Sequence, residues 1–324
     1  MRKLIMQAIN KILLDINPDS EQQPALNKAL FFANKQPIII KLLSCVYYPS
    51  VAASRLLAPH QLEKTKKVIL KFHQGQLIKL VKKNPIINVT YETQVIWHSP
   101  IYLGILQVVE TFKPDLLIKA THQHKTIIRR FFTPTDWYLL KACPIPVLLV
   151  KEQVWTKDSS VVAAIDPELN LSKESELDIN VLKTAVTVSS HLKTPLHAVH
   201  CFDPNYWDIL FEALGKTGMW GDVFPSEQNS PENESMLLEK LRYQHNVNFA
   251  QTCSEYVPNS ENQHIVSGDI EHILPETLTR LHAGILVLGT HRTRLLGSTA
   301  QRLVETVECD LLAVKPRDFE APFH

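Results

Sequence analysis

The sequence predicts an α/β protein built from two tandem, doubly wound domains, each with a five-stranded parallel sheet. The main observation is an internal repeat, because three apolar segments of the first half return in the same order in the second half. The matched segments are 12–18 with 162–167, 114–122 with 283–291, and 143–151 with 309–315. Short apolar runs also alternate with amphipathic stretches, as expected when helices cover both faces of a parallel sheet. We therefore expect one unit copied once, with domains at residues 1–153 and 154–324.

In the first half, five apolar runs are expected to form strands, with helices between them. The expected strands are 11–17, 37–46, 88–97, 115–120 and 147–151, and the expected helices are 23–33, 61–82, 101–111 and 136–141. The segment 61–82 repeats its apolar residues at helical spacing, which predicts that one face is buried. We interpret its lysine runs, Lys64, Lys66, Lys67, Lys82 and Lys83, as a solvated face.

The second half is expected to repeat this order after a short polar linker at 153–160. The expected strands are 161–165, 195–202, 248–253, 285–289 and 311–315, and the expected helices are 178–191, 232–243, 270–281 and 299–307. The edges of the two fifth strands are natural surfaces for contact between the domains. An insertion at 203–233, rich in proline, glycine and aromatic residues, is either a lid or partner surface, or a loop that covers its own apolar patch.

Composition limits the function classes. A length of 324 residues suits two domains, and a net charge of +1 predicts no general attraction to nucleic acid or to an anionic membrane. No secretory signal and no apolar run of about 20 residues is visible, so we expect a cytoplasmic protein. The five cysteines include two pairs at equivalent repeat positions, Cys45 with Cys201 and Cys143 with Cys309. This pattern favours core residues over disulfides or zinc ligands.

A ligand site is expected beyond the carboxyl ends of the strands, where the strand order of a doubly wound sheet reverses. In the second half, the loop after the fourth strand runs from Gly289 to Gly297 and is followed by Ser298. Glycines let backbone N–H groups approach a phosphate, and Arg292 adds positive charge. Alternatively, the glycines only form a tight turn and Ser298 caps a helix. The matching loop of the first half contains no glycine, so no phosphate cradle is expected there.

The first half carries a second polar group of residues. Asp15, His98, His122 and His124 follow its first, third and fourth strands and could converge at one edge of the sheet. A His-x-His pair on a loop is weak support for a metal site, and no acidic residue lies at a fixed spacing from it. The alternative is a hydrogen-bonded structural pocket that includes Asp136 and Trp137. We expect no metal.

Several unusual stretches resemble one known family, the universal stress proteins of the tandem type. They are Phe132-Thr-Pro-Thr-Asp-Trp137, Thr121-His-Gln-His124, Val95-Ile-Trp-His98, Gln23-Pro-Ala-Leu26 and Gly297-Ser-Thr299. The resemblance spans nearly the whole chain. It implies a pseudo-dimer of the two domains within one chain, with a homodimer of chains also open. It further implies a non-enzymatic role in resistance to stress such as DNA damage.

Nucleotide-binding members of this family carry an Asp after the first strand and a Gly-x2-Gly-x9-Gly-Ser/Thr loop after the fourth. The resemblance matches these to Asp166, Gly289 and Gly297-Ser298. The expected small-ligand site of the second half comprises Asp166, Cys201, Gly289, His291, Arg292, Gly297, Ser298 and Thr299.

This chain departs from the family loop in two ways. Arg292 occupies the position of the middle glycine, and eight positions instead of thirteen separate Gly289 from Gly297. Two functions therefore stay open: binding of ATP or another adenine nucleotide, and an interaction module that takes a partner or an apolar, lipid-like ligand. An enzyme is not expected, because the sequence has no G-x-S-x-G elbow, no Walker A loop and no spacing typical of a nucleophile and its base.

Overall fold

The structure is a computed structural model, and it describes residues 9–33, 37–53, 58–121, 132–151, 153–167, 174–203, 212–213, 216, 231–290, 306–316 and 319. The first half contains β1 (Lys11–Asp15), α1 (Pro24–Phe32), β2 (Ile38–Val46), α2 (Pro49–Ala52), α3 (Pro59–Lys83), β3 (Val89–Trp97), α4 (Ile101–Phe112), β4 (Leu116–Ala120), α5 (Pro134–Ala142) and β5 (Val147–Val150). The second half contains β6 (Ser160–Ala164), α6 (Glu174–Leu192), β7 (Leu196–Phe202), α9 (Pro231–Cys253), the 3-10 turn η1 (Ser260–Asn262), β8 (Gln263–Ser267), α10 (Ile270–Arg280), β9 (Ala283–Gly289) and β10 (Asp310–Val314).

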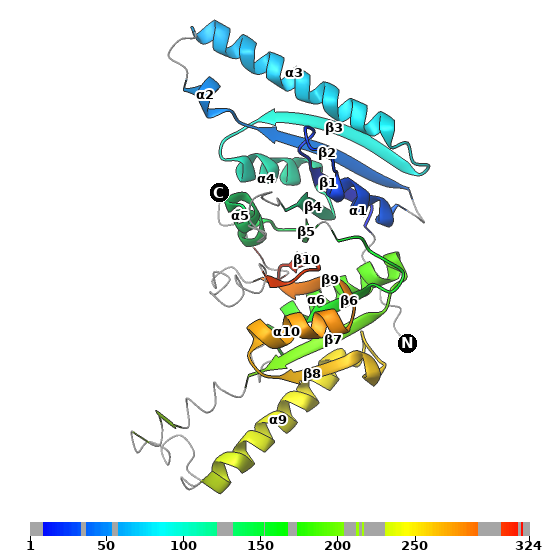
Figure 1. Cartoon of the computed structure of the whole chain (residues 1–324), viewed down its shortest axis with the longest axis vertical. Coiled ribbons are helices and arrows are strands. Elements are labelled where there is room, and N and C mark those ends of the chain that lie inside the picture. The colour runs from blue at the N-terminus through cyan, green and yellow to red at the C-terminus, as the bar shows by residue number, and fades with distance from the viewer. Residues whose placement is uncertain are drawn as a thin grey trace.

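Ten strands form one sheet in the order β3-β2-β1-β4-β5-β10-β9-β6-β7-β8. Within each half all neighbouring strands are parallel, and the order reverses beside the first strand, as a doubly wound sheet requires. The two halves meet where β5 pairs with β10 in the antiparallel direction (Figure 1). The contact expected between the fifth strands is therefore confirmed, but it merges two sheets that the sequence had suggested to be separate.

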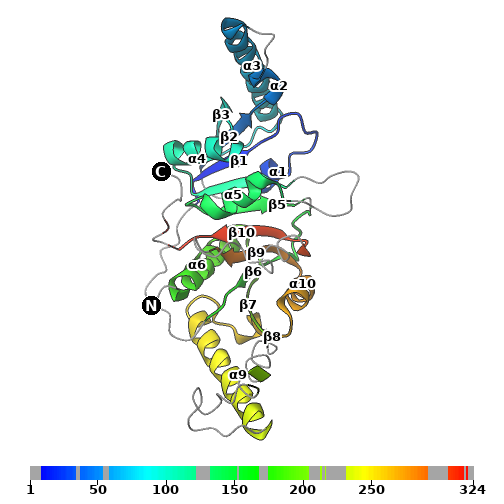
Figure 2. The ribbon, with the colours of Figure 1, turned by 90° about the vertical axis from the view of Figure 1, so that its left-hand side faces the viewer.

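The antiparallel junction places the two halves in opposite directions. Because β5 and β10 run antiparallel, the carboxyl ends of the first five strands lie at one edge of the sheet and those of the last five lie at the other. The two candidate ligand sites are therefore far apart in the fold and face opposite ways. Figure 2 shows the resulting arrangement, with α3 at one end of the molecule and α9 at the other.

Helices cover both faces of the sheet because the strand residues alternate between two cores. Ile12 and Leu14 belong to a core that includes residues of α1, α6 and α9, whereas Leu13 belongs to a second core that includes residues of α4, α5 and α10. All three of these strand residues are fully buried. This burial on both faces explains why the strands of the sequence lack a strict polar and apolar alternation.

Two lysines hold the halves together in a reciprocal way. Lys315 follows β10, and its Nζ donates to the carbonyl oxygens of Leu140 at 2.6 Å and of Lys141 at 3.1 Å, near the end of α5. Lys151 follows β5, and its Nζ donates to the carbonyl oxygen of Val307 in the other half. Each lysine therefore crosses the junction to carbonyl groups of the opposite domain. Burial lowers the pKa of Lys315 to about 8.

One expected strand is wrong. Residues 248–253 form the last turns of α9, and the third strand of the second half is β8. The buried residues Phe249, Cys253 and Tyr256 recur at helical spacing and pack into the core, which fits a helix better than a strand. β8 pairs only with β7 at the edge of the sheet, so its residues are half-exposed and its sequence is more polar.

Most of the predicted insertion at 203–233 and most of the expected helix at 299–307 lie outside the described residues. Within the part of the chain that is described, no helix combines the length and the apolar character needed to cross a membrane.

Candidate functional site

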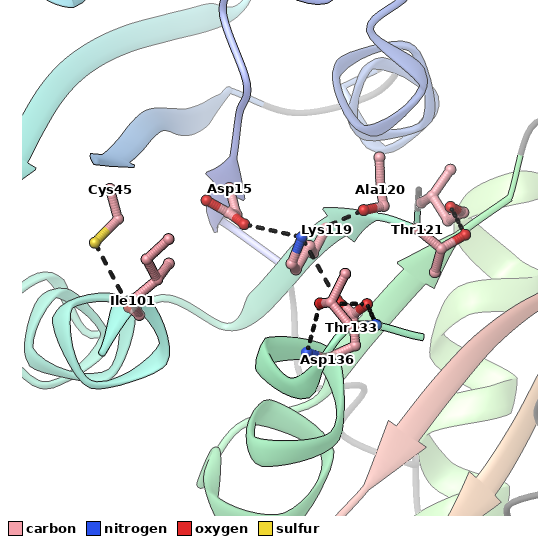
Figure 3. Close-up of polar contacts among 9 residues, drawn as sticks. Asp15, Cys45, Ile101, Lys119, Ala120, Thr121, Thr133 and Asp136 are labelled. Carbon is pink, nitrogen blue, oxygen red and sulfur yellow. Dashed lines mark hydrogen bonds and ion pairs between the residues drawn. The ribbon is translucent and has the colours of Figure 1, made fainter. Parts of the chain in front are cut away.

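The carboxyl edge of the first half is occupied by a buried ion cluster. Figure 3 shows Lys119, at the end of β4, between Asp15 from the end of β1 and Asp136 from the first turn of α5. The Lys119 Nζ lies 3.2 Å from Asp15 Oδ2 and 3.5 Å from Asp136 Oδ1. It also donates to the carbonyl oxygen of Ala120 at 3.4 Å. The three side chains are 7%, 14% and 0% exposed, in the order Lys119, Asp15 and Asp136.

The helix start of α5 fixes one carboxylate of this cluster. Thr133 is the N-cap of α5: its Oγ1 accepts from the backbone N–H of Asp136, and its own N–H donates to Asp136 Oδ2 at 2.7 Å. This reciprocal capping box fixes the Asp136 carboxyl group in the core. Burial alone would lower the pKa of Lys119, but the carboxylates of Asp15 and Asp136 outweigh burial and raise it. Lys119 is therefore protonated at neutral pH.

The cluster bears on the two interpretations of the first-half polar residues. Asp15 faces Lys119 and Asp136, in agreement with a structural pocket around Asp136. His98 belongs to a neighbouring turn, where its Nδ1 lies 2.9 Å from the carbonyl oxygen of Pro100. His122 and His124 lie outside the described residues. Among the described residues, no group of three or more His, Cys, Asp and Glu side chains is arranged to hold a metal ion.

The corresponding edge of the second half is built differently. Asp166 lies just beyond β6, at the repeat position of Asn17, and its side chain is 69% exposed, whereas the repeat position of Asp15 holds Ala164. The repeat position of Lys119 holds Leu288, so these two positions do not form here the lysine–carboxylate cluster of the first half. The partner of Asp166 is a histidine: its Oδ1 lies 3.4 Å from Nδ1 of His200, which is buried on β7. The acceptor groups of Asp166 therefore remain open to solvent on one side.

His200 contacts a second histidine, His245, and neither of them had been singled out from the sequence. Its Nδ1 lies 3.2 Å from the carbonyl oxygen of Ile165, and its Nε2 lies 3.1 Å from Nδ1 of His245 on α9. A carbonyl oxygen can only accept, so Nδ1 of His200 carries the proton and Nε2 accepts from His245 when the pair is neutral. The two rings are stacked with centroids 5.1 Å apart. The repeat position in the first half holds Ser44, and this exchange is the signal that could have pointed to His200.

Cys201 and Gly289 complete the described part of the site. Burial, with a smaller effect from Asp166, raises the pKa of the Cys201 thiol to about 12, so this thiol stays protonated and unreactive. A Cβ atom on Gly289 would lie 2.6 Å from Cγ of Leu177 in α6. Packing against Leu177 therefore already requires a residue without a side chain at position 289. The remaining expected site residues, His291, Arg292, Gly297, Ser298 and Thr299, lie outside the described residues.

We expect the histidine pair to make the protein less stable in mild acid. Burial lowers the pKa values of His200 and His245 below the usual 6.5, although Asp166 opposes this shift. The unfolded chain then binds protons first, so the free energy of unfolding falls as the pH drops through about 6.5 and below. The urea midpoint should be lower at about pH 5.5 than at about pH 7.5, and His245→Gln should reduce this difference. His272→Gln, at a side chain that is 83% exposed, is the control and should leave it unchanged.

The comparisons with known proteins agree with this architecture. The model of the universal stress protein family matches residues 8–151 and again residues 160–315. Universal stress protein E of Photorhabdus laumondii subsp. laumondii is 30% identical over 324 residues, which cover 98% of each chain. Universal stress protein E of Escherichia coli K12 is 27% identical and covers 98% of this chain and 97% of its own.

The solved structures show the same fold. A Pseudomonas aeruginosa UCBPP-PA14 protein assigned to the universal stress proteins superposes with a TM-score of 0.70 at 23% identity, covering 97% of this chain and 95% of its own. A universal stress protein of Archaeoglobus fulgidus gives a TM-score of 0.55 at 12% identity, covering 96% and 98%. With two family matches along the chain and full-length similarity to tandem relatives, the chain belongs to the universal stress protein family.

Proposed function

We propose that this protein is a non-enzymatic stress-response protein whose second half binds a small ligand, an adenine nucleotide, beside Asp166. The observation that carries the proposal is the difference between the carboxylates near the carboxyl ends of the first strands of the two halves. Asp15 is 14% exposed and is neutralised by Lys119, whereas Asp166 is 69% exposed and, among the described residues, its carboxylate lies near His200, whose pKa is lowered. In the described part of the chain, the Asp166 carboxylate is therefore the more accessible of the two to a hydrogen-bond donor of a ligand.

The chemistry of Asp166 suits an adenine nucleotide. A carboxylate accepts hydrogen bonds, and the amino group of adenine and the hydroxyls of ribose are donors that can reach it. In the family, the aspartate after the first strand of a domain is the residue directed at the nucleotide, and the match of both halves to the family supports the same use here. The phosphates would then lie toward the loop that begins at Gly289.

A binding role fits the described side chains better than a catalytic role. Burial raises the pKa of each of the five cysteine thiols to about 12, so none is a thiolate nucleophile at neutral pH. In the neutral pair, His200 uses Nδ1 on a backbone carbonyl and Nε2 on His245, which leaves neither nitrogen free to take a proton from a substrate. The histidine pair therefore positions the Asp166 side chain and takes no part in proton transfer.

The test is a calorimetric titration of the full chain with ATP, ADP and AMP. We expect saturable binding that Asp166→Asn weakens about 10- to 100-fold, because a hydrogen bond to a charged group contributes roughly 1.5–3 kcal/mol. Asp15→Asn makes the same change near the end of the first strand of the other half; it is the control and should leave nucleotide affinity unchanged. Absence of heat and of any melting-temperature shift at millimolar nucleotide would instead support the interaction module, and release of phosphate above a blank would support an enzyme.

A further inference from the structure

The helix α3 presents a surface that the fold does not use. One face of α3 packs on the sheet through His73 and Leu77, which are 4% and 0% exposed. The opposite face carries three large apolar side chains in solvent: Val68 is 62% exposed, Phe72 is 56% exposed and Ile78 is 41% exposed. An exposed apolar group on a helix that already has a buried face indicates a contact with something outside the chain.

The charges around these apolar side chains have one sign. The lysines of α3 are Lys64, Lys66, Lys67, Lys71, Lys79, Lys82 and Lys83, and its only acidic residue is Glu63. The carboxylate of Glu63 is already paired within the helix, because it lies 2.8 Å from Lys66 Nζ. At 100° per residue, Lys64, Lys71, Lys79 and Lys82 fall on the same outward side as Val68 and Ile78. All six of these residues are exposed.

The equivalent helix of the second half shows that this charge pattern does not follow from the fold. α9 occupies the repeat position of α3 and carries Glu232, Glu234 and Glu239 with Lys240 and Arg242. It too has exposed apolar residues, with Tyr243 at 71%, but its charges are mixed. The net charge of the whole chain, +1, therefore hides a strongly basic end.

We propose that the outward face of α3 is a docking surface for an anionic lipid membrane. A helix with lysines and exposed apolar residues on one face binds in the plane of the lipid headgroups, with the apolar side chains inserted and the ammonium groups on phosphates. Nucleic acid shares the negative charge but gives no reason for an exposed Phe72, Val68 and Ile78. The apolar residues therefore favour lipid.

The position of α3 makes such contact feasible. In both views α3 lies at the extreme end of the molecule, beyond β3 and remote from the second half (Figure 1; Figure 2). From Lys64 to Lys82 the helix spans roughly 27 Å at 1.5 Å per residue. A flat membrane can meet this whole length without touching the second half. The proposal departs from the expectation, drawn from net charge, that the chain has no general attraction to anionic membranes, and it is independent of nucleotide binding.

The test is cosedimentation of the full chain with vesicles. We expect binding to phosphatidylcholine vesicles that contain about 30% phosphatidylserine, and much weaker binding to phosphatidylcholine alone or in about 0.5 M salt. The triple variant K64Q/K71Q/K82Q should bind about 100-fold more weakly, since one lysine near an anionic surface contributes roughly fivefold. The control triple variant K113Q/K157Q/K193Q removes the same charge from other exposed sites and should bind like the unmodified chain.

The apolar contribution is tested separately. Phe72→Ser should weaken vesicle binding about tenfold, because it removes the inserted ring, while Tyr243→Ser on α9 should have no effect. All four side chains of the lysine and aromatic variants on α3 are exposed, so circular dichroism and the melting temperature should be unchanged. Equal binding of duplex DNA and lipid with no effect of Phe72→Ser would overturn the proposal in favour of nucleic acid. Absence of any binding to anionic vesicles would overturn it outright.

Discussion

Replacing Lys119 with methionine is expected to lower the free energy of unfolding by about 3–5 kcal/mol, because a buried charge loses its partner. The change removes the ammonium group that Asp15 and Asp136 share and leaves the carboxylate of Asp136, with no exposed side-chain surface, inside the core. The hydrogen bonds from Thr133 to Asp136 remain, but they do not cancel its charge. Urea unfolding at neutral pH measures the loss.

Two further variants serve as controls: one at the repeat position of Lys119 and one within the ion cluster. Leu288→Met places the same side chain at the equivalent position of the second half, and a volume-conserving change there should cost less than about 1.5 kcal/mol. Asp136→Asn added to Lys119→Met removes the stranded charge and should restore part of the stability. If Lys119→Met were no more harmful than Leu288→Met, the cluster would not hold the first-half edge together.

The pH dependence of this loss is also fixed by the cluster. Because the pKa of Lys119 is raised above 10.5, its contribution is fully present below that value and is lost only as the pH rises through the folded-state pKa. The difference between the unmodified chain and Lys119→Met should therefore stay constant between about pH 7 and pH 9.

The repeat made much of the fold predictable from the sequence. Nine of the ten strands overlap the expected segments, and all nine except the edge strand β3 carry buried apolar residues. The strand outside the expected segments is β8, whose residues are only half-buried and so resemble a loop in sequence. The end of α9 was mistaken for a strand because Phe249 and Cys253 face the core from a short segment that fits either period.

The candidate sites were less predictable, because their chemistry depends on neighbours distant in sequence. The exchange of Leu288 for Lys119 between the halves is visible in the sequence, yet only the fold shows that Lys119 meets Asp15 and Asp136. In the same way, the repeat aligns His200 with Ser44, but its contact with His245 crosses from β7 to α9. Matching the halves position by position reveals such differences, and the contacts in the fold then show which residues each of them meets.

The second large effect is expected at the junction of the two halves, where replacing Lys28 with methionine should also cost about 3–5 kcal/mol. Lys28 in α1 crosses to β10, and its Nζ lies 2.9 Å from Asp310 Oδ2, with both side chains at most 5% exposed. The same ammonium lies 4.0 Å from the centre of the Trp155 ring. The other carboxylate oxygen of Asp310 accepts from the backbone N–H of Lys151 at 2.7 Å. Removing Lys28 leaves Asp310 charged and buried across the junction.

The pKa values say how this loss should depend on pH. Burial raises the pKa of Asp310 and lowers that of Lys28, and in each case the partner only partly opposes the shift. Desolvation therefore outweighs the mutual attraction of the pair. In Lys28→Met, a proton taken up by Asp310 would remove the unpaired charge, so the loss of stability should be largest near neutral pH and should shrink as the pH falls toward about 5.

A double variant separates the charge from the packing. Lys28→Met with Asp310→Asn removes both charges and keeps an oxygen that can accept from the N–H of Lys151, so it should recover most of the stability that Lys28→Met loses. Lys41→Met is the matched control: its ion pair with Glu92 is equally short at 3.0 Å, but Glu92 is 45% exposed, so the cost should stay below about 1 kcal/mol. The double variant could instead be as unstable as Lys28→Met. The loss would then come from packing of the aliphatic chain of Lys28 against Trp155, and not from the unpaired carboxylate of Asp310.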